Sequence, residues 1–180
     1  MSDVTVSLMR ALHFAAQKHR GQRRKGAAAE PYINHVAEVA LLVAEATGGT
    51  DPLAVVGALL HDTIEDTAAT ADDLTREFSA DVAALVAEVT DDKTLPKQER
   101  KRLQIETTAD RSHRAKLIKI ADKTSNLRSV TESPPVHWDT ARCREYFEWA
   151  KRVVDGCRGA NAWLEARFDE TYERGRRELE

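Results

Sequence analysis

The sequence predicts an all-α fold with little or no β structure, and three observations support this prediction. Apolar residues recur every three to four positions along most of the 180 residues, which is the spacing of amphipathic helices. No stretch shows the sustained alternation, bounded by turn residues, that marks half-buried strands. Hydrophobic residues make up 42% and charged residues 32%, as in globular proteins. We therefore expect one domain over residues 1–180.

The first helices follow from apolar spacing and from capping residues. Segments 6–16 and 36–44 carry apolar residues on one face, and Gly48-Gly49 suit the C-terminal cap of the second. Asp51 then serves as an N-cap and Pro52 as the first turn of a helix over 52–62. Two shorter helices are expected at 70–77 and 80–89.

The later helices are separated by prolines and polar loops. Pro96 opens a polar helix that extends to about residue 106, and segment 115–130 is strongly apolar on one side. Pro134-Pro135 break the chain, and the last two helices are expected at 138–157 and 159–177. The segments 89–96 and 131–136 are expected to be surface loops and candidates for the rim of a pocket.

Composition and charge exclude several classes of function. No apolar run approaches the roughly 18 residues that cross a membrane, and the N-terminus lacks the features of a secretory signal. A net charge of −3 does not favour a nucleic-acid polymer, so phosphate binding must come from local basic clusters. On one helix, Cys143 and Cys157 would lie about 21 Å apart, too far for a disulfide. We therefore expect a cytoplasmic protein with no membrane and no nucleic-acid partner.

Four ionisable residues lie close together after the apolar run of the third helix: His61, Asp62, Glu65 and Asp66. If the helix continues through them, all four fall within an arc of roughly 140°. Such charges beside a core need a neutralising group, and a divalent cation with nitrogen and oxygen ligands provides one. The alternative is a frayed helix end with solvated acids, although three acids at a helix C-terminus oppose the helix dipole.

Two further residues are candidate metal ligands, each with a simpler alternative. His35 lies at the start of the second expected helix, where a capping or surface-packing role is the alternative. Asp122 follows apolar residues on the expected buried helix 115–130, where a carboxylate needs a partner. The ammonium group of Lys123 is the alternative to a metal as the partner of the Asp122 carboxylate. Spacing alone does not show that these segments converge.

The order of these residues resembles the H…HD…D pattern of the HD phosphohydrolase superfamily. The surrounding motifs resemble the hydrolase domain of the RelA/SpoT enzymes, and the later ones resemble the stand-alone small alarmone hydrolases of animals. The motifs are FAAQKHRGQRRK (14–25), PYINH (31–35), LHDTIEDT (60–67), VTDDKTLPK (89–97) followed by ERKRLQ (99–104), IADK (120–123) and REYFEWA (144–150). The resemblance spans about residues 11–164 and implies an HD-domain helical bundle that acts without synthetase or regulatory domains.

The resemblance implies a metal-dependent hydrolase. It places Mn²⁺ on His35, His61, Asp62 and Asp122, although such ligands also suit Fe²⁺, Zn²⁺ or Ni²⁺. It implies hydrolysis of the 3′-pyrophosphate of guanosine tetra- or pentaphosphate (ppGpp or pppGpp), the alarmones of the stringent response, to GDP or GTP and pyrophosphate. The Glu65-Asp66 pair would orient the attacking water or carry its proton. Replacing Glu65 with alanine should then keep the metal and lose turnover.

The same matching assigns nucleotide contacts. They are Arg24, Lys25, Tyr32, Lys97, Asn126, Trp138, Arg142 and Tyr146. Helix packing is the alternative for the two aromatic residues Trp138 and Tyr146, and a solvated helix end is the alternative for the basic cluster 19–25.

The chain departs from many relatives at two places, and both leave the substrate preference open. Thr124-Ser125 stand where those relatives have a leucine and then an aromatic residue or histidine, which predicts a smaller wall on the base side of the pocket. The loop 131–137 does not match closely, and it brings His137 near the expected pocket.

The sequence is also compatible with two other functions. One is the 2′-phosphatase reaction on NADPH, or hydrolysis of another nucleotide, because the same metal can attack that ester. The other is a non-catalytic HD module that binds a nucleotide as a sensor. The complete ligand set and the acidic pair favour an enzyme over a sensor.

Overall fold

The computed structural model describes residues 2–180, which form ten α-helices and a short 3₁₀ helix, without a β-strand in that range. The α-helices are α1 (Ser2–Lys18), α2 (Tyr32–Ala46), α3 (Pro52–Leu60), α4 (Thr63–Asp66), α5 (Ala71–Glu77), α6 (Ala80–Val89), α7 (Lys97–Thr107), α8 (His113–Glu132), α9 (Thr140–Asp155) and α10 (Ala162–Glu178). The predicted all-α class is confirmed. No helix within residues 2–180 is long and apolar enough to cross a membrane.

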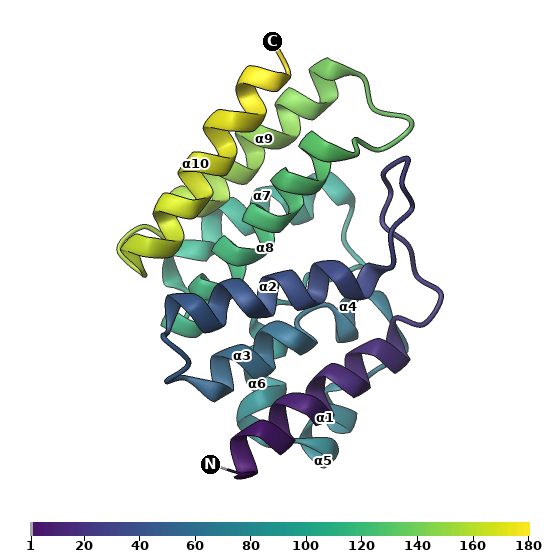
Figure 1. Ribbon diagram of the computed structural model, residues 1–180, viewed down its shortest axis with the longest axis vertical. Coiled ribbons are helices and arrows are strands. Elements are labelled where there is room, and N and C mark those ends of the chain that lie inside the picture. Colours follow the sequence, from purple (N-terminus) through teal and green to yellow (C-terminus); the bar gives the residue numbers. More distant parts are fainter. Residues whose placement is uncertain (1) are drawn as a thin grey trace.

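Helix α8 is the centre of the fold. It packs against α2, α3, α6, α9 and α10, and 12 of its 20 residues are buried. Figure 1 shows α9 and α10 running beside α8 in the upper half of the molecule, with α1, α3, α5 and α6 gathered below. Because α8 is covered on several sides, its polar residues Lys119, Asp122 and Lys123 are buried and need partners inside the protein.

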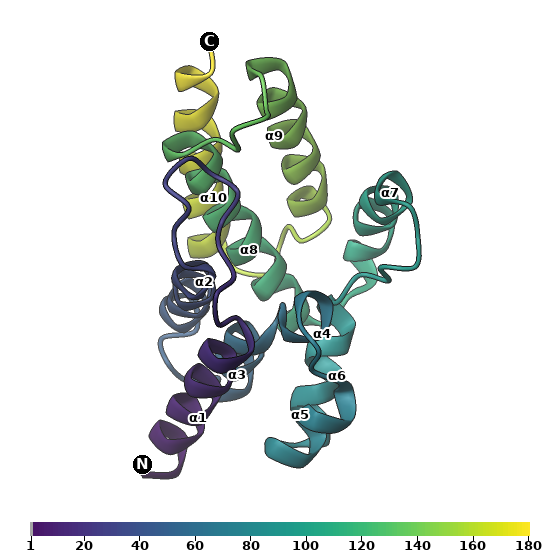
Figure 2. The same ribbon diagram turned by 90° about the vertical axis from the view of Figure 1, so that its right-hand side faces the viewer.

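Helix α7 contributes little to the core. None of its residues is buried, as its polar sequence predicts, and it contacts α9. Figure 2 shows α7 on one side of the molecule and α8 with α9 on the other, with α4 below them. The side chains of α7 are therefore free to face a cavity rather than the core.

Capping residues set the bounds of α2 and α3 as predicted. Gly48 and Gly49 follow α2 with φ angles of 57° and 71°, in the left-handed region that glycine tolerates best. The Asp51 side chain accepts a hydrogen bond from the Ala54 N–H, and Pro52 is the first residue of α3.

The helix expected over residues 52–62 ends earlier. The prediction that it continues through Glu65 and Asp66 was therefore wrong. Helix α3 stops at Leu60, a turn contains His61 and Asp62, and α4 follows. The Thr63 hydroxyl donates to the Leu60 carbonyl oxygen at 2.7 Å, which satisfies an acceptor at the end of α3. The projected arc of roughly 140° therefore does not describe this segment.

The last two helices begin later than expected. Asp139 caps α9, so Trp138 lies before the helix. Gly159 has a φ of 86°, which belongs to a turn, and Asn161 caps α10. Cys157 lies beyond the end of α9, so the two cysteines do not share one helix as expected. Both thiols are buried and free of disulfides within the described chain.

Candidate functional site

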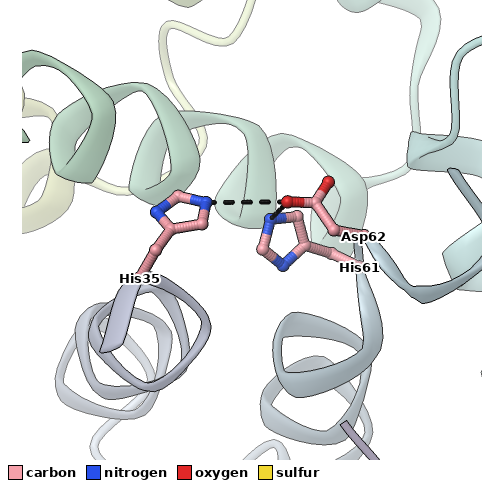
Figure 3. A group of neighbouring side chains, drawn as sticks. All are labelled: His35, His61 and Asp62. Atoms are coloured by element: carbon pink, nitrogen blue, oxygen red, sulfur yellow. Dashed lines mark ion pairs between the residues drawn. The ribbon is translucent and has the colours of Figure 1, made fainter. Parts of the chain in front are cut away.

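The two histidines and two aspartates predicted as metal ligands come together beside α8. Nε2 of His35 lies 3.4 Å from Asp122 Oδ1 and 3.7 Å from Asp62 Oδ2. Nε2 of His61 lies 3.0 Å from Asp62 Oδ2 and 3.9 Å from Asp122 Oδ1. Figure 3 shows His35, from α2, and the His61-Asp62 turn directing their side chains toward one another. The suggested surface role of His35 was wrong, because only 3% of the residue is exposed.

The histidine nitrogens that face the carboxylates lack a hydrogen-bond partner. Nδ1 of His61 lies 2.8 Å from the Ala58 carbonyl oxygen, which can only accept, so Nδ1 carries the proton. Among residues 2–180, nothing forms a hydrogen bond with the buried Nε2 atoms of His35 and His61. Lone pairs that face carboxylates are unfavourable unless a cation lies between them. Two imidazoles and two carboxylates suit a divalent cation, so these residues fit a metal.

The electrostatics of this centre also call for a cation. Burial by itself lowers the pKa of His61, but the carboxylates of Asp62 and Asp122 outweigh it and raise the pKa to about 9. Burial by itself raises the pKa of Asp62, but His61 and His35 hold it well below its usual range. Without a metal the centre therefore takes up a proton, and a metal would replace that proton.

Asp122 has partners on both of its carboxylate oxygens. Oδ1 faces the histidines and accepts a hydrogen bond from the Asn126 amide at 2.6 Å. Oδ2 accepts a hydrogen bond from Lys123 Nζ at 2.8 Å. Asp122 therefore pairs with Lys123, as the alternative predicted, and it also faces the two histidines. Lys123 also lies over the ring of Trp149, with Nζ 4.6 Å from the ring centroid.

Tyr32, predicted as a nucleotide contact, also binds a candidate metal ligand. Its hydroxyl donates to Asp62 Oδ2 at 2.5 Å. Burial, together with the Asp62 charge, raises the pKa of Tyr32, so the hydroxyl keeps its proton and remains a donor. The ring stacks on His19, with centroids 5.0 Å apart, and meets His35 edge-on at 5.4 Å. Tyr32 therefore orients Asp62 as well as lining the cavity described below.

Replacing Tyr32 with phenylalanine removes this hydrogen bond and keeps the ring contacts. We expect the affinity for Mn²⁺ to fall about 10-fold, because losing a partner of a ligating carboxylate typically costs this much. Isothermal titration calorimetry on metal-stripped protein measures the change. An unchanged affinity with a raised KM would instead show that the hydroxyl serves the substrate alone.

The acidic residues Glu65 and Asp66 line the same cavity, and both lie near Lys93. The Lys93 ammonium binds the Asp66 carboxylate. Glu65 accepts a hydrogen bond from the Asp91 N–H at 3.1 Å. Burial raises the pKa of Glu65, and the charges of Asp91 and Asp62 raise it further. Lys93 Nζ also lies 3.9 Å from Glu65 Oε1, and Arg100 Nη1 lies 3.6 Å from the same oxygen. Burial and the two aspartates nevertheless leave the pKa of Glu65 raised, so it is a carboxylate with increased proton affinity, whereas Asp66 is bound directly by Lys93.

A cavity of about 970 Å³ opens beside the metal-ligand candidates. The acidic residues that line it include Asp62, Asp122 and Glu65. All of the predicted nucleotide contacts line it, namely Arg24, Lys25, Tyr32, Lys97, Asn126, Trp138, Arg142 and Tyr146. Burial lowers the pKa of Lys97, and repulsion from nearby cations, Arg142 first among them, lowers it further. Such crowding of cations is expected where an anion is to be bound.

Aromatic rings form part of the cavity wall near α9. Tyr146 lies between Trp138 and Trp149, with ring centroids 5.3 Å from each. The three rings line the cavity and are only partly buried, so helix packing alone does not account for Trp138 and Tyr146. Lys101 Nζ lies 4.7 Å from the Trp149 centroid, and the guanidinium carbon of Arg142 lies 5.0 Å from that of Trp138.

The sequence reasoning missed three residues of this wall: Lys101, Lys123 and Trp149. Lys101 and Trp149 belong to two segments whose resemblance to known hydrolases was recognised, but they are brought together only by the packing of α7 against α9. Lys123 was considered as a partner of Asp122 and not as a cavity residue. The signal that could have identified these three residues was their position inside segments that resemble known hydrolases.

The prediction that Thr124 and Ser125 make the wall on the base side of the pocket smaller was wrong. Both side chains are buried, and within the described chain neither lines the cavity. Residues four apart share a helix face, so Asp122 and Asn126 both face the cavity, whereas Thr124 and Ser125 point elsewhere. Residues 131 and 132 belong to α8, and the loop over 133–137 does reach the cavity, which it lines with His137 among others. This loop is therefore the departure that bears on the substrate.

Comparisons with known proteins identify the family and a solved structure of similar fold. A family model described as HD domain matches residues 11–145. The chain is 50% identical over 168 residues to a guanosine-3′,5′-bis(diphosphate) 3′-pyrophosphohydrolase of Drosophila melanogaster, covering 93% of this chain and 94% of that protein. It is 50% identical over 165 residues to its Homo sapiens counterpart, covering 92% of each. A solved structure of a metazoan SpoT ortholog, described as hydrolysing ppGpp, matches with a TM-score of 0.90 at 50% identity, covering 93% of this chain and 94% of that one.

Proposed function

The chain belongs to the HD-domain family, among relatives that are guanosine-3′,5′-bis(diphosphate) 3′-pyrophosphohydrolases, and from this membership we propose that it hydrolyses ppGpp and pppGpp. Water replaces the 3′-pyrophosphate, and the products are GDP or GTP and pyrophosphate. The observation that carries the proposal is a cavity lined both by candidate metal ligands, namely His61, Asp62 and Asp122, and by several cationic side chains. Such a cavity suits a small nucleotide with several phosphates.

The metal of this centre is proposed to be Mn²⁺, held by His35, His61, Asp62 and Asp122. The unpartnered Nε2 atoms and the buried carboxylates support these ligands. A bound divalent cation lowers the pKa of water and polarises a phosphate oxygen. Fe²⁺, Zn²⁺ and Ni²⁺ suit the same ligand types, so a comparison of the four metals in one assay identifies the most effective.

Glu65 is the proposed proton acceptor for the attacking water. Its raised pKa makes it a better base than an ordinary glutamate, and it lines the cavity near Asp62. Water attacks the phosphorus attached to the ribose 3′ oxygen, and the bond between them breaks. Pyrophosphate leaves, and the 3′ oxygen takes up a proton. Asp66, which is bound by Lys93, has the secondary role of orienting groups at this end of the cavity.

The cations of the wall are proposed to bind the phosphates, and the rings to bind guanine. Arg24 is held in place by a hydrogen bond of 2.8 Å to Asn126 Oδ1 and lies 5.6 Å above the centre of the Tyr32 ring. A guanidinium that is already oriented loses little freedom on binding phosphate. Trp138 and Tyr146 line the cavity and are only partly buried, so a purine can stack against them.

The function is tested by comparing two substrates at equal Mn²⁺. Purified protein is incubated with ppGpp or NADPH, and GDP, pyrophosphate and inorganic phosphate are quantified. We expect kcat/KM to be higher for ppGpp. A higher value for NADPH would make the 2′-phosphatase reaction the main activity. Nucleotide binding without product from either substrate would make the chain a sensor module.

We further propose that residues 1–180 act as one hydrolase domain in the cytoplasm. The helices share a hydrophobic core that includes residues from α1 to α10. The buried thiols of Cys143 and Cys157 suit a reducing compartment.

A further inference from the structure

Behind His35, three side chains form a connected series of hydrogen bonds. His35 Nδ1 lies 2.9 Å from the Ser125 hydroxyl oxygen, and this hydroxyl donates to one carboxylate oxygen of Glu38. The other carboxylate oxygen of Glu38 accepts a hydrogen bond from Arg128 at 2.8 Å. Ser125 is 2% exposed. In the described chain none of Ser125, Glu38 and Arg128 lines the cavity, so their effect on the reaction must pass through His35.

The direction of each hydrogen bond follows from the chemistry of its partners. Arg128 can only donate, and the Glu38 carboxylate can only accept. Ser125 therefore gives its single proton to Glu38, and its oxygen accepts the proton of His35 Nδ1. The neutral imidazole then has its lone pair on Nε2, the atom that faces Asp62 and Asp122. This is the tautomer that binds a metal through Nε2.

We propose that Glu38 is a positioning residue of the metal centre, which through Ser125 holds His35 in its metal-binding tautomer and fixes the plane of its ring. This inference rests on the metal site proposed above. His61 obtains the same tautomer from the backbone carbonyl of Ala58, which a side-chain substitution leaves in place. His35 depends on two side chains, so its half of the centre can be altered by substitution.

Glu38→Gln tests the direction of the hydrogen bonds because it changes little in shape. Arg128 still requires an acceptor, so the amide oxygen faces Arg128 and the NH₂ group faces Ser125. Ser125 then has to donate to His35 Nδ1, which moves the histidine proton to Nε2 and removes its lone pair. Glu38→Ala leaves the Ser125 hydroxyl free to donate to water and keeps the original tautomer available. We expect the Kd for Mn²⁺ to rise about 10- to 100-fold in Glu38→Gln and by a smaller factor in Glu38→Ala.

This order of effects separates positioning from packing. If Glu38 only filled space, the glutamine variant, which is nearly the same shape, would be milder than the alanine variant. Isothermal titration calorimetry of Mn²⁺ into metal-stripped protein measures both, and circular dichroism verifies the helical fold. Glu45→Gln, an exposed position two turns further along α2, is the matched control and should bind Mn²⁺ as the parent protein does.

Ser125→Ala provides a second test that leaves Glu38 and Arg128 paired. We expect its Kd for Mn²⁺ to rise about 10-fold, and Glu38→Gln should add little in that background because both act through one route. Parent-like affinity in Glu38→Gln and Ser125→Ala, additive losses in the double variant, or a milder Glu38→Gln than Glu38→Ala would each overturn the inference. Absence of Mn²⁺ binding by the parent protein would instead overturn the metal site itself.

Discussion

Replacing His61 and Asp62 together with alanine is expected to abolish Mn²⁺ binding and to reduce ppGpp hydrolysis by at least about 10³-fold. Two of the four proposed ligands are lost, and a bound metal contributes several kcal/mol to the stabilisation of such a reaction, where each 1.36 kcal/mol is about tenfold in rate. Pyrophosphate release and the metal content of the dialysed protein measure the two effects. A double alanine variant of the exposed residues Asp110 and His113 is the control for lost charge at the surface.

The same variant can be examined without measuring turnover. A ligand that binds only the folded protein stabilises it by about 2.7 kcal/mol at a concentration 100 times its Kd. For a chain of this size that amounts to a rise in Tm of roughly 5–10 °C, at about 2–4 °C per kcal/mol. The parent protein should show this rise with Mn²⁺, and the His61/Asp62 variant should not. Retained activity or a retained Tm shift would contradict the assignment of the centre.

Replacing Glu65 with glutamine is expected to lower kcat about 10²- to 10⁴-fold and to leave Mn²⁺ affinity nearly unchanged. Glutamine keeps an oxygen that accepts the Asp91 N–H, which Glu65 bonds at 3.1 Å, but it cannot take a proton from water. Steady-state kinetics and calorimetry separate the two quantities. Asp66→Asn is the matched comparison and should lose less activity, because Lys93 already neutralises that carboxylate. Full activity in the Glu65 variant would remove this residue from the mechanism.

The raised pKa of Glu65 also predicts how stability depends on pH. Burial and the nearby carboxylates of Asp91 and Asp62 raise this pKa above its ordinary value, so ionisation is less favourable in the folded chain than in the unfolded one. Ionisation of Glu65 therefore lowers the free energy of unfolding as pH rises through the interval between the two values, and this cost is absent at lower pH. Metal-free Glu65→Gln should melt above the metal-free parent protein at pH 7, with a smaller difference near about pH 4. Equal differences at both pH values would contradict the raised pKa.

The sequence by itself determined the features of this protein that depend on neighbouring residues. Helical spacing predicted the all-α class and the bounds of α6, and Asp51 with Pro52 predicted the start of α3, because side-chain periodicity and capping act within a few residues. The break after Leu60 was missed because apolar spacing does not reveal a turn of two polar residues, which here is accompanied by a hydrogen bond from the Thr63 hydroxyl to the Leu60 carbonyl oxygen. Ordered motifs, matched to a known family, supplied the candidate ligands and cavity residues.

Only the tertiary structure decided how distant residues meet. His35, Asp62 and Asp122 lie on separate segments, and they converge because α2 and α3 both pack against α8. The sequence predicted that Ser125 forms part of the cavity wall. The same packing instead directs its side chain away from the cavity and toward His35. Helical periodicity shows which residues share a face of one helix, but the neighbour of that face is chosen by the packing of the whole core.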